Sequence, residues 1–220
     1  MKKLVIFGIT HLAEVAHFYF THDSPYEVVA FTVHEAYLNQ KDLLGLPVVS
    51  YEKIIEDYPP DDFSLFIAVG YKQVNSFRAS IYNDAKQKGY LLPTYLSSRL
   101  VSWGETKIGD NCFILENQTI QPFVEIGNDV VVWSGNHIGH HVKIGDHCFI
   151  TSHVVISGNV TVGDYSFLGV NATIRDGITI EKRSVIGAGT IILEDTRENS
   201  IYKSEQTKPL FFDHSKLKGF

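Results

Sequence analysis

Aliphatic residues recur at every sixth position over the central part of the chain. From Ile108 onward each sixth residue is Ile, Val or Leu, without interruption, at Ile108, Ile114, Ile120, Ile126, Val132, Ile138, Ile144, Ile150, Ile156, Val162, Leu168, Ile174, Ile180, Ile186 and Ile192. This spacing matches neither the period of a helix nor the alternation of a strand. It is typical of a repeated structural unit in which one side chain per unit faces a shared core.

The six-residue unit predicts a parallel β-helix. Each hexad forms a short strand and a turn, three hexads close one coil, and the aliphatic side chain points into the resulting prism. Because side chains alternate along a strand, the residue two positions before the next aliphatic also points inward. That position holds mostly small or slim residues: Cys112, Val124, Val130, Val142, Cys148, Val154, Val160, Ser166, Ala172, Ser184 and Thr190. A Gly follows many of the aliphatics, which suits a corner with unusual backbone angles or a close approach between coils.

The hexad pattern resembles that of the hexapeptide-repeat acyltransferases over residues from about 105 to 195. The resemblance implies a left-handed β-helix, although the general rule for parallel crossovers favours a right-handed one. We therefore expect residues 98–195 to form a left-handed β-helix acyltransferase domain and residues 196–220 to form a C-terminal tail.

Strand and helix patterns alternate in the first part of the chain. Short apolar runs predict strands, and apolar residues at helical spacing predict helices between them. The strands are expected over Lys3–Gly8, Glu27–Val33, Ser64–Val69 and Tyr90–Leu96, with one helix after the N-cap Thr10 and another that carries Val74 on its apolar face. This alternation favours a small parallel sheet, so residues 1–97 are predicted to form a Rossmann-like α/β domain.

Ligands bind at the carboxyl ends of the strands in such sheets. The first and third strands end near two stretches, which makes their residues candidates for a nucleotide site: Gly8, Ile9, Thr10 and His11, and Gly70, Tyr71 and Lys72. The first of the two stretches reads Gly-x-Thr-x-x-Ala, a degraded form of the Gly-x-Gly-x-x-Gly fingerprint. An ordinary strand-to-helix turn gives the same pattern, so the motif alone leaves both interpretations open.

A small α/β domain in front of a hexapeptide β-helix resembles the bacterial nucleotide-sugar acetyltransferases, and this resemblance covers nearly the whole chain. These enzymes acetylate amino groups of UDP-, GDP- or dTDP-linked amino-deoxysugars, and their relatives include the sialic acid O-acetyltransferases. The resemblance implies acetyl-CoA as co-substrate and a homotrimer that holds acyl-CoA between neighbouring subunits. It also implies a nucleotide bound by the N-terminal domain, often with acidic residues just after the second strand, where only Glu35 is available.

Five of the ten histidines fall within a short stretch of the β-helix: His137, His140, His141, His147 and His153. Residues three hexads apart stack on the same face, so His140 is expected beside Gly158, with space for a thioester and an exposed backbone N–H. Acyl transfer to an amine needs a group that accepts a proton near neutral pH and a donor for the developing oxyanion. In the resembled enzymes the catalytic His precedes an acidic residue, and the matching position here is His140, followed by His141.

The same register places other residues of the resembled site. Gly158, Val170 and Ala188 fall where that family contacts the pantetheine arm and thioester, and Lys208 in the tail is a candidate for the phosphates of acetyl-CoA. Trp133, Asn136 and His137 are candidates for a sugar pocket, with packing between subunits as the alternative. His147 and His153 are expected on the outer surface of the β-helix.

Charge and composition narrow the possible partners. The net charge of −6 argues against nucleic acid, because phosphate backbones require a basic surface. No apolar run approaches the length of a membrane span, and the start of the chain lacks the features of a signal peptide, so a cytoplasmic protein is expected. Cys112 and Cys148 occupy inward positions of the hexad and are interpreted as buried core residues.

The leading hypothesis is acetyl-CoA-dependent N-acetylation of a nucleotide-linked amino sugar, without a metal. A second imidazole beside His140 makes a weaker base than a carboxylate would, which favours an amine over a hydroxyl acceptor. O-acetylation of a sugar or sialic acid is the nearest alternative. Two others are a zinc enzyme resembling the gamma-class carbonic anhydrases, with His137, His140 and His141 as ligands, and a scaffold without catalytic activity.

Overall fold

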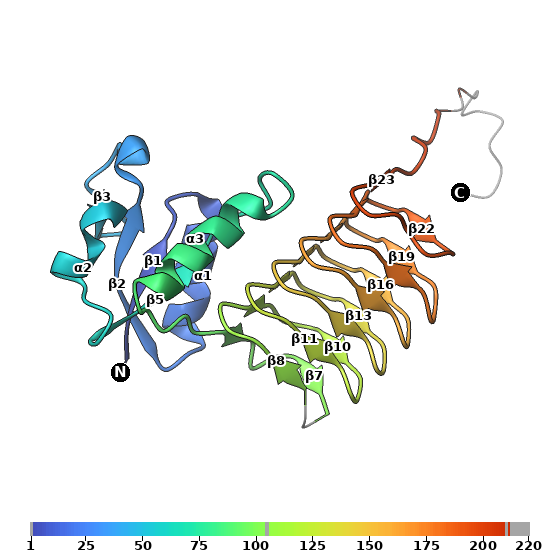
Figure 1. Cartoon of the computed structure of the whole chain (residues 1–220), viewed down its shortest axis with the longest axis horizontal. Coiled ribbons are helices and arrows are strands. Elements are labelled where there is room, and N and C mark those ends of the chain that lie inside the picture. Colours follow the sequence, from blue (N-terminus) through green and yellow to red (C-terminus); the bar gives the residue numbers. More distant parts are fainter. Residues whose placement is uncertain (1, 104–105, 210, 212–220) are drawn as a thin grey trace.

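The computed structural model describes residues 2–103, 106–209 and 211. Two parts lie side by side (Figure 1): an α/β domain, and a prism of stacked coils that continues to the C-terminal part of the chain.

The α/β domain is built on a five-stranded sheet with the order β3-β4-β2-β1-β5. Strands β1, β2, β4 and β5 are parallel, and β3 forms an antiparallel hairpin with β4. The strands are β1 Lys2–Phe7, β2 Tyr26–Val33, β3 Asp42–Leu43, β4 Leu46–Ser50 and β5 Phe63–Ile67; the helices are α1 His11–His22, α2 Ile54–Asp57 and α3 Ser76–Gln87, with short 3-10 turns η1 Glu35–Tyr37 and η2 Tyr51–Lys53. Helix α1 packs on one face of the sheet with Leu4 and Ile6, whereas α3 packs on the other with Val5 and Phe7.

Two predicted elements differ from the structure. The last strand, expected over Tyr90–Leu96, is not part of this sheet: β6 covers only Tyr95–Leu96 and pairs with β9 of the prism. The carbonyl of Leu91 accepts a hydrogen bond from the N–H of Leu65 in β5. Pro93 has no N–H, so this pairing cannot continue along the segment as a strand. Helix α3 begins at Ser76, after Val74, because residues 73–75 have left-handed backbone angles.

The prism consists of two-residue strands in three parallel sheets, each strand pairing with those one coil before and after it. We name the sheets by what their outer surfaces carry. The docked face holds β6 Tyr95–Leu96, β9 Phe113–Ile114, β12 Val131–Val132, β15 Phe149–Ile150, β18 Phe167–Leu168, β21 Val185–Ile186 and β23 Ile201–Tyr202. The uncharged face holds β7 Val101–Ser102, β10 Thr119–Ile120, β13 His137–Ile138, β16 Val155–Ile156, β19 Thr173–Ile174 and β22 Ile191–Ile192. The charged face holds β8 Lys107–Ile108, β11 Glu125–Ile126, β14 Lys143–Ile144, β17 Thr161–Val162 and β20 Thr179–Ile180.

The interior of the prism confirms the hexad prediction. The repeated aliphatic is the second residue of every strand from β8 to β22, and from Ile114 onward these side chains are buried in one continuous cluster. The slim residues two positions before the next aliphatic are buried with them. Cys112 and Cys148 are among these, and burial raises the pKa of both thiols to about 12.

At the corners of the prism, the close approach between coils and the left-handed backbone angle occur at different residues, although the sequence analysis assigned both to the Gly after the aliphatic. The Gly after an aliphatic serves close approach alone: at Gly139, an added Cβ would lie 2.6 Å from the backbone N of Gly158 in the next coil. The left-handed angle falls two residues later, where φ is 50° at Asn111 and 59° at His141. Asn, Asp and His tolerate this conformation better than most residues, so a turn can close without Gly.

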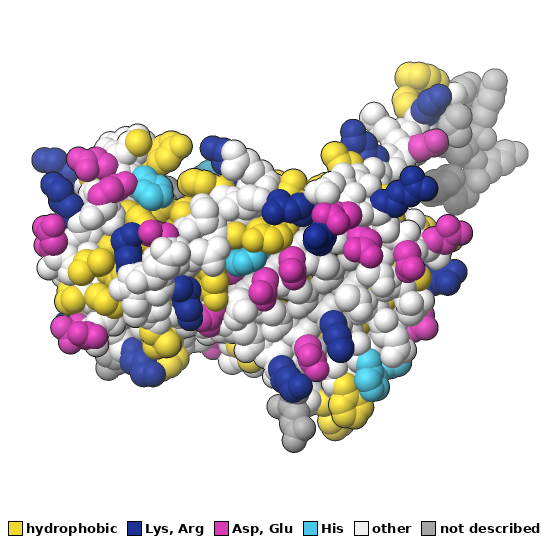
Figure 2. Space-filling model, viewed as in Figure 1, with side chains coloured by type: hydrophobic (Ala, Val, Ile, Leu, Met, Phe, Trp, Pro, Cys, Tyr) yellow, Lys and Arg dark blue, Asp and Glu magenta, His cyan; other side chains and the backbone are white. Residues whose placement is uncertain are grey.

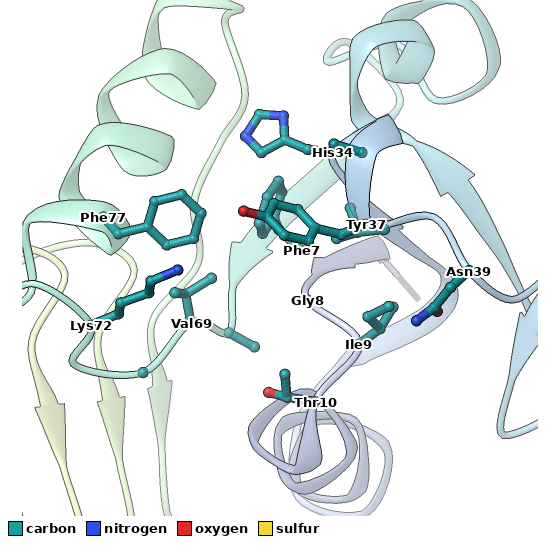
Figure 3. A pocket seen from close by; sticks show the side chains of 14 residues that line it. Phe7, Gly8, Ile9, Thr10, His34, Tyr37, Asn39, Val69, Lys72 and Phe77 are labelled. Carbon is teal, nitrogen blue, oxygen red and sulfur yellow. The ribbon is translucent and has the colours of Figure 1, made fainter.

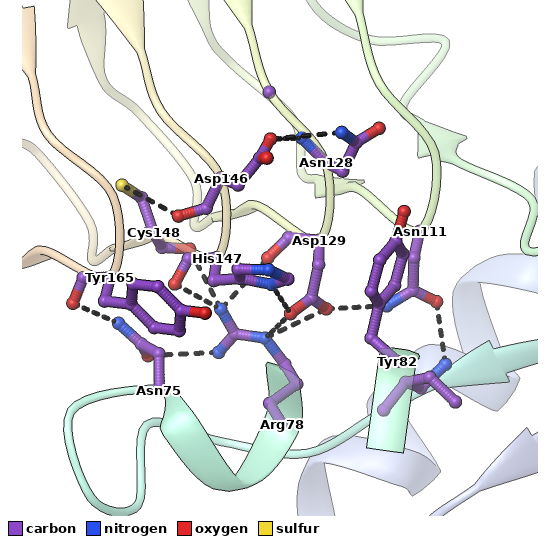
Figure 4. Close-up of polar contacts among 12 residues, drawn as sticks. Asn75, Arg78, Tyr82, Asn111, Asn128, Asp129, Asp146, His147, Cys148 and Tyr165 are labelled. Atoms are coloured by element: carbon purple, nitrogen blue, oxygen red, sulfur yellow. Dashed lines mark hydrogen bonds and ion pairs between the residues drawn. The ribbon is translucent and has the colours of Figure 1, made fainter. Parts of the chain in front are cut away.

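The N-terminal domain is fastened to the docked face by a buried charged cluster (Figure 4). Arg78 of α3 is fully buried, and its Nε donates to both carboxylate oxygens of Asp129 at 3.1 Å. Its Nη2 donates to the backbone carbonyl of His147 at 2.8 Å, and the His147 Nδ1 lies 2.8 Å from Asp129 Oδ2. Asn111 joins the two parts further, because its side chain accepts a hydrogen bond from the N–H of Ile67 in β5. These contacts hold α3 and the sheet in a defined position on the prism.

Candidate functional site

A cavity of about 560 Å³ opens at the carboxyl ends of β1, β2 and β5 (Figure 3). It is lined by Phe7, Gly8, Ile9, Thr10, Val33, His34, Ala36, Tyr37, Asn39, Ala68, Val69, Gly70, Lys72 and Phe77. The Lys72 ammonium and the Tyr37 hydroxyl point inward from opposite sides, and the Phe77 ring borders the cavity next to Lys72. The cavity therefore offers aromatic walls and one cation.

The floor of the cavity depends on Gly8. Its φ is +129°, and an added Cβ would lie 2.7 Å from the carbonyl oxygen of Ala68 on the neighbouring strand end. Thr10 follows as the N-cap of α1, but its hydroxyl makes no capping hydrogen bond and remains available to a ligand. The start of a helix favours anionic groups, so this end of the cavity suits a phosphate.

The region after β2 is organised by Glu52. Its carboxylate lies 2.9 Å from His34 Nδ1 and accepts hydrogen bonds from the Ser50 hydroxyl and the backbone N–H of Glu35. Partial burial raises the pKa of Glu52, but these hydrogen bonds outweigh it and lower the pKa to about 2. The carboxylate fixed near the end of β2 thus belongs to Glu52, which positions His34 at the cavity.

Of the residues predicted for a nucleotide site, Gly8, Ile9, Thr10, Gly70 and Lys72 line this cavity. The other three, His11, Glu35 and Tyr71, are not among the lining residues. Tyr71 instead packs against Phe149 and Phe167 of the docked face, at ring distances of 5.1 and 4.8 Å.

Sequence reasoning missed several residues of the lining. His34 directly follows β2, so the rule about strand ends was sufficient to find it. Tyr37 and Asn39 lie beyond the end of β2, and nothing in the local pattern distinguishes them from other residues of that connection. Phe77 belongs to α3, where the helical spacing of apolar residues predicts core packing and not a place in the cavity. Lys72, which follows Gly70 and Tyr71 in the predicted stretch, does line the cavity.

His140 and Gly158 adjoin in successive coils, as the register predicts. An added Cβ on Gly158 would lie 2.7 Å from both Cε1 and Nε2 of the His140 ring. The backbone of His140 is held by Gln121, whose side-chain oxygen accepts its N–H at 2.9 Å. Within the described residues the N–H of Gly158 donates to no acceptor. The corner between the uncharged and charged faces therefore presents a free N–H beside an exposed imidazole.

His141 orients the His140 ring. The Nδ1 atoms of the two rings are 3.2 Å apart, a distance at which one donates and the other accepts when their tautomers differ. His141 in turn lies against the Phe123 ring, with centroids 4.6 Å apart. This leaves the Nε2 of His140 directed at the space outside Gly158.

The remaining acetyl-CoA candidates lie elsewhere on the same subunit. Val170 and Ala188 are exposed one coil apart at the corner between the docked and uncharged faces, so the uncharged face separates them from His140. Lys208 is exposed in the tail. One chain alone does not bring these residues together.

Of the three residues predicted for a sugar pocket, Asn136 requires correction. Asn136 is 2% exposed and uses its side chain inside the prism, where it accepts the N–H of Val154, so it cannot line a pocket. Trp133 packs against the apolar cluster between the two domains. His137 is partly exposed on the uncharged face, between Thr119 and Val155.

The two histidines expected on the outer surface differ. His153 is exposed, but His147 is buried against Asp129, because α3 covers this corner of the prism. Across residues 2–103, 106–209 and 211, no three His, Cys, Asp or Glu side chains are grouped as a metal site would require. No helix in the same ranges has both the length and the apolar character to cross a membrane.

Family models match the prism. The model described as bacterial transferase hexapeptide (six repeats) matches residues 105–139 and 123–158, and that of the hexapeptide repeat of succinyl-transferase matches residues 159–194. The central part of the chain is a hexapeptide-repeat domain. No curated protein matched the chain in a sequence comparison.

Solved structures of similar fold span both parts of the chain. The acetyltransferase domain of PglB from Neisseria gonorrhoeae, in complex with acetyl coenzyme A, is 22% identical, with a TM-score of 0.83 over 95% of this chain and 99% of that one. A mutant of perosamine N-acetyltransferase from Caulobacter crescentus, in complex with CoA and GDP-perosamine, is 23% identical, with a TM-score of 0.79 over 90% of each chain. WeeI from Acinetobacter baumannii is 19% identical, with a TM-score of 0.77 over 90% and 94%. The predicted fold, an α/β domain followed by a left-handed β-helix, is thereby confirmed.

Proposed function

We propose that the protein is an acetyl-CoA-dependent N-acetyltransferase that acts on a nucleotide-linked amino-deoxysugar. The observation that carries the proposal is the His140 imidazole directed at the space outside Gly158, next to a backbone N–H for which none of the described residues is the acceptor. Two proteins of the same fold support it, since one is described with acetyl coenzyme A and the other with CoA and GDP-perosamine. Residues 1–97 then serve the nucleotide and residues 98–195 the acyl transfer.

The cavity of the N-terminal domain is the proposed nucleotide site. Thr10 and the start of α1 suit the diphosphate, and Lys72 adds a positive charge from the other side. Tyr37 and Phe77 offer aromatic surface for a base or sugar ring.

The cavity and His140 lie on different sides of one subunit. Tyr71, next to the cavity, packs on the docked face, whereas His140 stands at the corner opposite that face. Both lie at the same level along the prism, because Phe149, which Tyr71 contacts, belongs to the same coil as His140. A second subunit that brings its cavity to this corner would complete the site.

The uncharged face is the proposed contact between subunits. None of its outward residues Val101, Thr119, His137, Val155, Thr173 and Ile191 is Lys, Arg, Asp or Glu. Val101 and Ile191 are 62% and 65% exposed in the single chain. On the charged face, by contrast, Lys107 and Glu125 form an ion pair that suits contact with water. Lys, Arg, Asp and Glu side chains are also interspersed over the β-helix on the side seen in Figure 2.

A homotrimer with the uncharged faces toward a common axis would unite the separated residues. The corner that carries His140 and Gly158 would then meet the neighbour's corner that carries Val170 and Ala188. Acetyl-CoA would lie in the groove between them. The neighbour's N-terminal domain, which sits beside that second corner, would deliver the sugar.

The reaction is a direct attack of the sugar amine on the thioester. The neutral amine adds to the carbonyl carbon, and the Gly158 N–H donates to the oxygen that becomes negative. His140 Nε2 takes a proton from the nitrogen, while His141 holds the ring at Nδ1. The carbon–sulfur bond then breaks, and the thiolate of CoA leaves and takes up that proton.

A thiol-release assay with acetyl-CoA tests the proposal. The purified protein is supplied in turn with UDP-, GDP- and dTDP-linked amino sugars, each paired with the sugar that carries a hydroxyl at the same carbon. CoA release that depends on an amino sugar, with the acetamido product seen by mass spectrometry, is the expected result. Faster turnover of the hydroxy sugars would make the protein an O-acetyltransferase, and stoichiometric zinc with no CoA release would reject the proposal.

A further inference from the structure

A carboxylate borders the space outside Gly158 from the side opposite His140. An added Cβ on Gly158 would lie 3.1 Å from Asp176 Oδ1, and 2.7 Å from His140 Nε2. Asp176 occupies the same corner one coil further on, as the hydrogen bond from the N–H of Gly177 to the carbonyl of Gly158 requires. The missing side chain of Gly158 therefore leaves a gap between an imidazole and a carboxylate.

The carboxylate of Asp176 is not engaged elsewhere. It is exposed and takes part in no ion pair or side-chain hydrogen bond with the described residues. Other corner carboxylates are used by the fold: those of Asp146 and Asp164 each accept a backbone N–H from the preceding coil. Asp176 differs because the residue one coil before it is Gly158, whose N–H and missing side chain are turned to the proposed site.

We propose that Asp176 binds the amino group of the acceptor and thereby selects an amine over a hydroxyl. This inference rests on the proposed acetyl transfer and names the residue that recognises its nucleophile. Near neutral pH an amino sugar arrives largely as an ammonium ion, and a carboxylate is the acceptor that such a cation prefers. A hydroxyl brings no charge to Asp176 and gains much less from it.

The proton balance follows from this placement. The ammonium, held between Asp176 and His140, loses one proton to solvent and attacks the thioester carbon as the neutral amine. His140 takes the second proton from nitrogen, and the departing CoA thiolate receives it. Asp176 accepts hydrogen bonds throughout and forms no covalent bond.

The test compares Asp176→Asn with wild type, using the amino and hydroxy sugars of the nucleotide series that wild type accepts. Asn keeps the shape and removes the charge, so KM for the amino sugar is expected to rise about 10- to 100-fold, the range of a hydrogen bond to a charged group. The preference for the amino over the hydroxy sugar should fall by a similar factor. Asp176→Glu should restore part of both.

Glu181→Gln is the matched control, because it removes an exposed carboxylate from another corner, and its kinetics should equal those of wild type. Acetyl-CoA binding and the melting temperature show whether the Asp176→Asn variant is folded. If wild type is active and Asp176→Asn has the same KM for the amino sugar and the same preference for it, the role of Asp176 is overturned and the proposed function stands. A wild type that releases no CoA with any amino sugar overturns the proposed function instead.

Discussion

Single residues at the corners explain both the success and the failure of the sequence interpretation. Register alone placed His140 beside Gly158, because the backbone repeat fixes which residues stack. The same reasoning did not anticipate that His141, His147 and His153 all occupy the left-handed position of a turn, with φ of 59° to 60°. A histidine there is explained by backbone geometry alone. The cluster of histidines is therefore partly a property of the turns, and only His140 and His141 meet at the candidate site.

At this scale the first prediction concerns the base. His140→Ala should lower kcat by about a hundred- to ten-thousandfold, the usual contribution of a general base. Acetyl-CoA binding should be kept, since the backbone at this corner is held by Gln121. Steady-state kinetics together with calorimetric titration of acetyl-CoA measure both quantities. His22→Ala, on an exposed histidine of α1, is the control, and a His140→Ala enzyme with half the wild-type rate would place the base elsewhere.

The second prediction concerns the space beside Gly158 that its missing side chain leaves open. Gly158→Ala puts a methyl group 2.7 Å from the His140 ring, so the ring must move and the thioester loses its space. Acetyl-CoA affinity should fall at least about tenfold, or roughly 1.4 kcal/mol. Gly70→Ala is the control for acetyl-CoA binding, because nothing lies within 4 Å of its added Cβ. Equal acetyl-CoA affinity in the two variants would contradict the assignment of this corner.

Among the elements, α3 was predicted correctly as a helix, but its role in fastening the N-terminal domain to the prism was not predicted. Its apolar face accounts for packing on the sheet, and Arg78 would be expected in solvent on composition alone. It is buried because Asp129 and the backbone carbonyls of the prism satisfy it. Likewise, the apolar content of Tyr90–Leu96 indicated a strand, although the segment is the connection from the α/β sheet into the first coil. The burial of Arg78 and the pairing of Tyr95–Leu96 with the prism both depend on residues distant in sequence.

At the element scale we predict that Arg78→Ala destabilises the protein by about 3–5 kcal/mol, since Asp129 is left buried without its cation. Lys86→Ala removes the more exposed ion pair of the same helix with Asp110 and should cost less than about 1 kcal/mol. Urea unfolding followed by circular dichroism measures the difference. Similar midpoints for both variants would show that the buried cluster is not what fastens the domains.

For the whole molecule, the sequence predicted the order and type of both parts, because the hexad repeat of the prism is strict and the alternation of strands and helices in the first domain is local. It could not place the two parts relative to each other. The outward residues of the docked face, such as Phe113, Phe149 and Phe167, are apolar, but nothing in the sequence of the first domain shows which of its surfaces covers them, and the cavity lining has no period. The faces of the prism differ in their outward residues alone, and that difference becomes visible once strands are assigned to sheets. The proposed trimer arises at this scale, from the uncharged face.

The corresponding prediction places a charge on that face. Val155→Glu should convert a trimer into monomers, because three unpaired carboxylates would be buried around one axis. Thr161→Glu puts the same charge on the charged face and should leave the trimer intact. Sedimentation velocity at micromolar concentration distinguishes the two. A wild type that sediments as a monomer would reject the trimer outright.

The stacking of coils also sets the width of the space between His140 and Asp176. Neighbouring coils are spaced like neighbouring strands, so the backbones of His140 and Asp176, with Gly158 between them, stand about 10 Å apart. Two side chains already enter that interval from its ends, and the acceptor nitrogen shares what is left with the thioester carbonyl. A primary amine fits there, whereas an amine that carries a further methyl group must push one of the two side chains aside. The enzyme should therefore turn over an amino sugar much faster than its N-methyl derivative, and equal rates would mean that the gap is wider than the coil spacing allows.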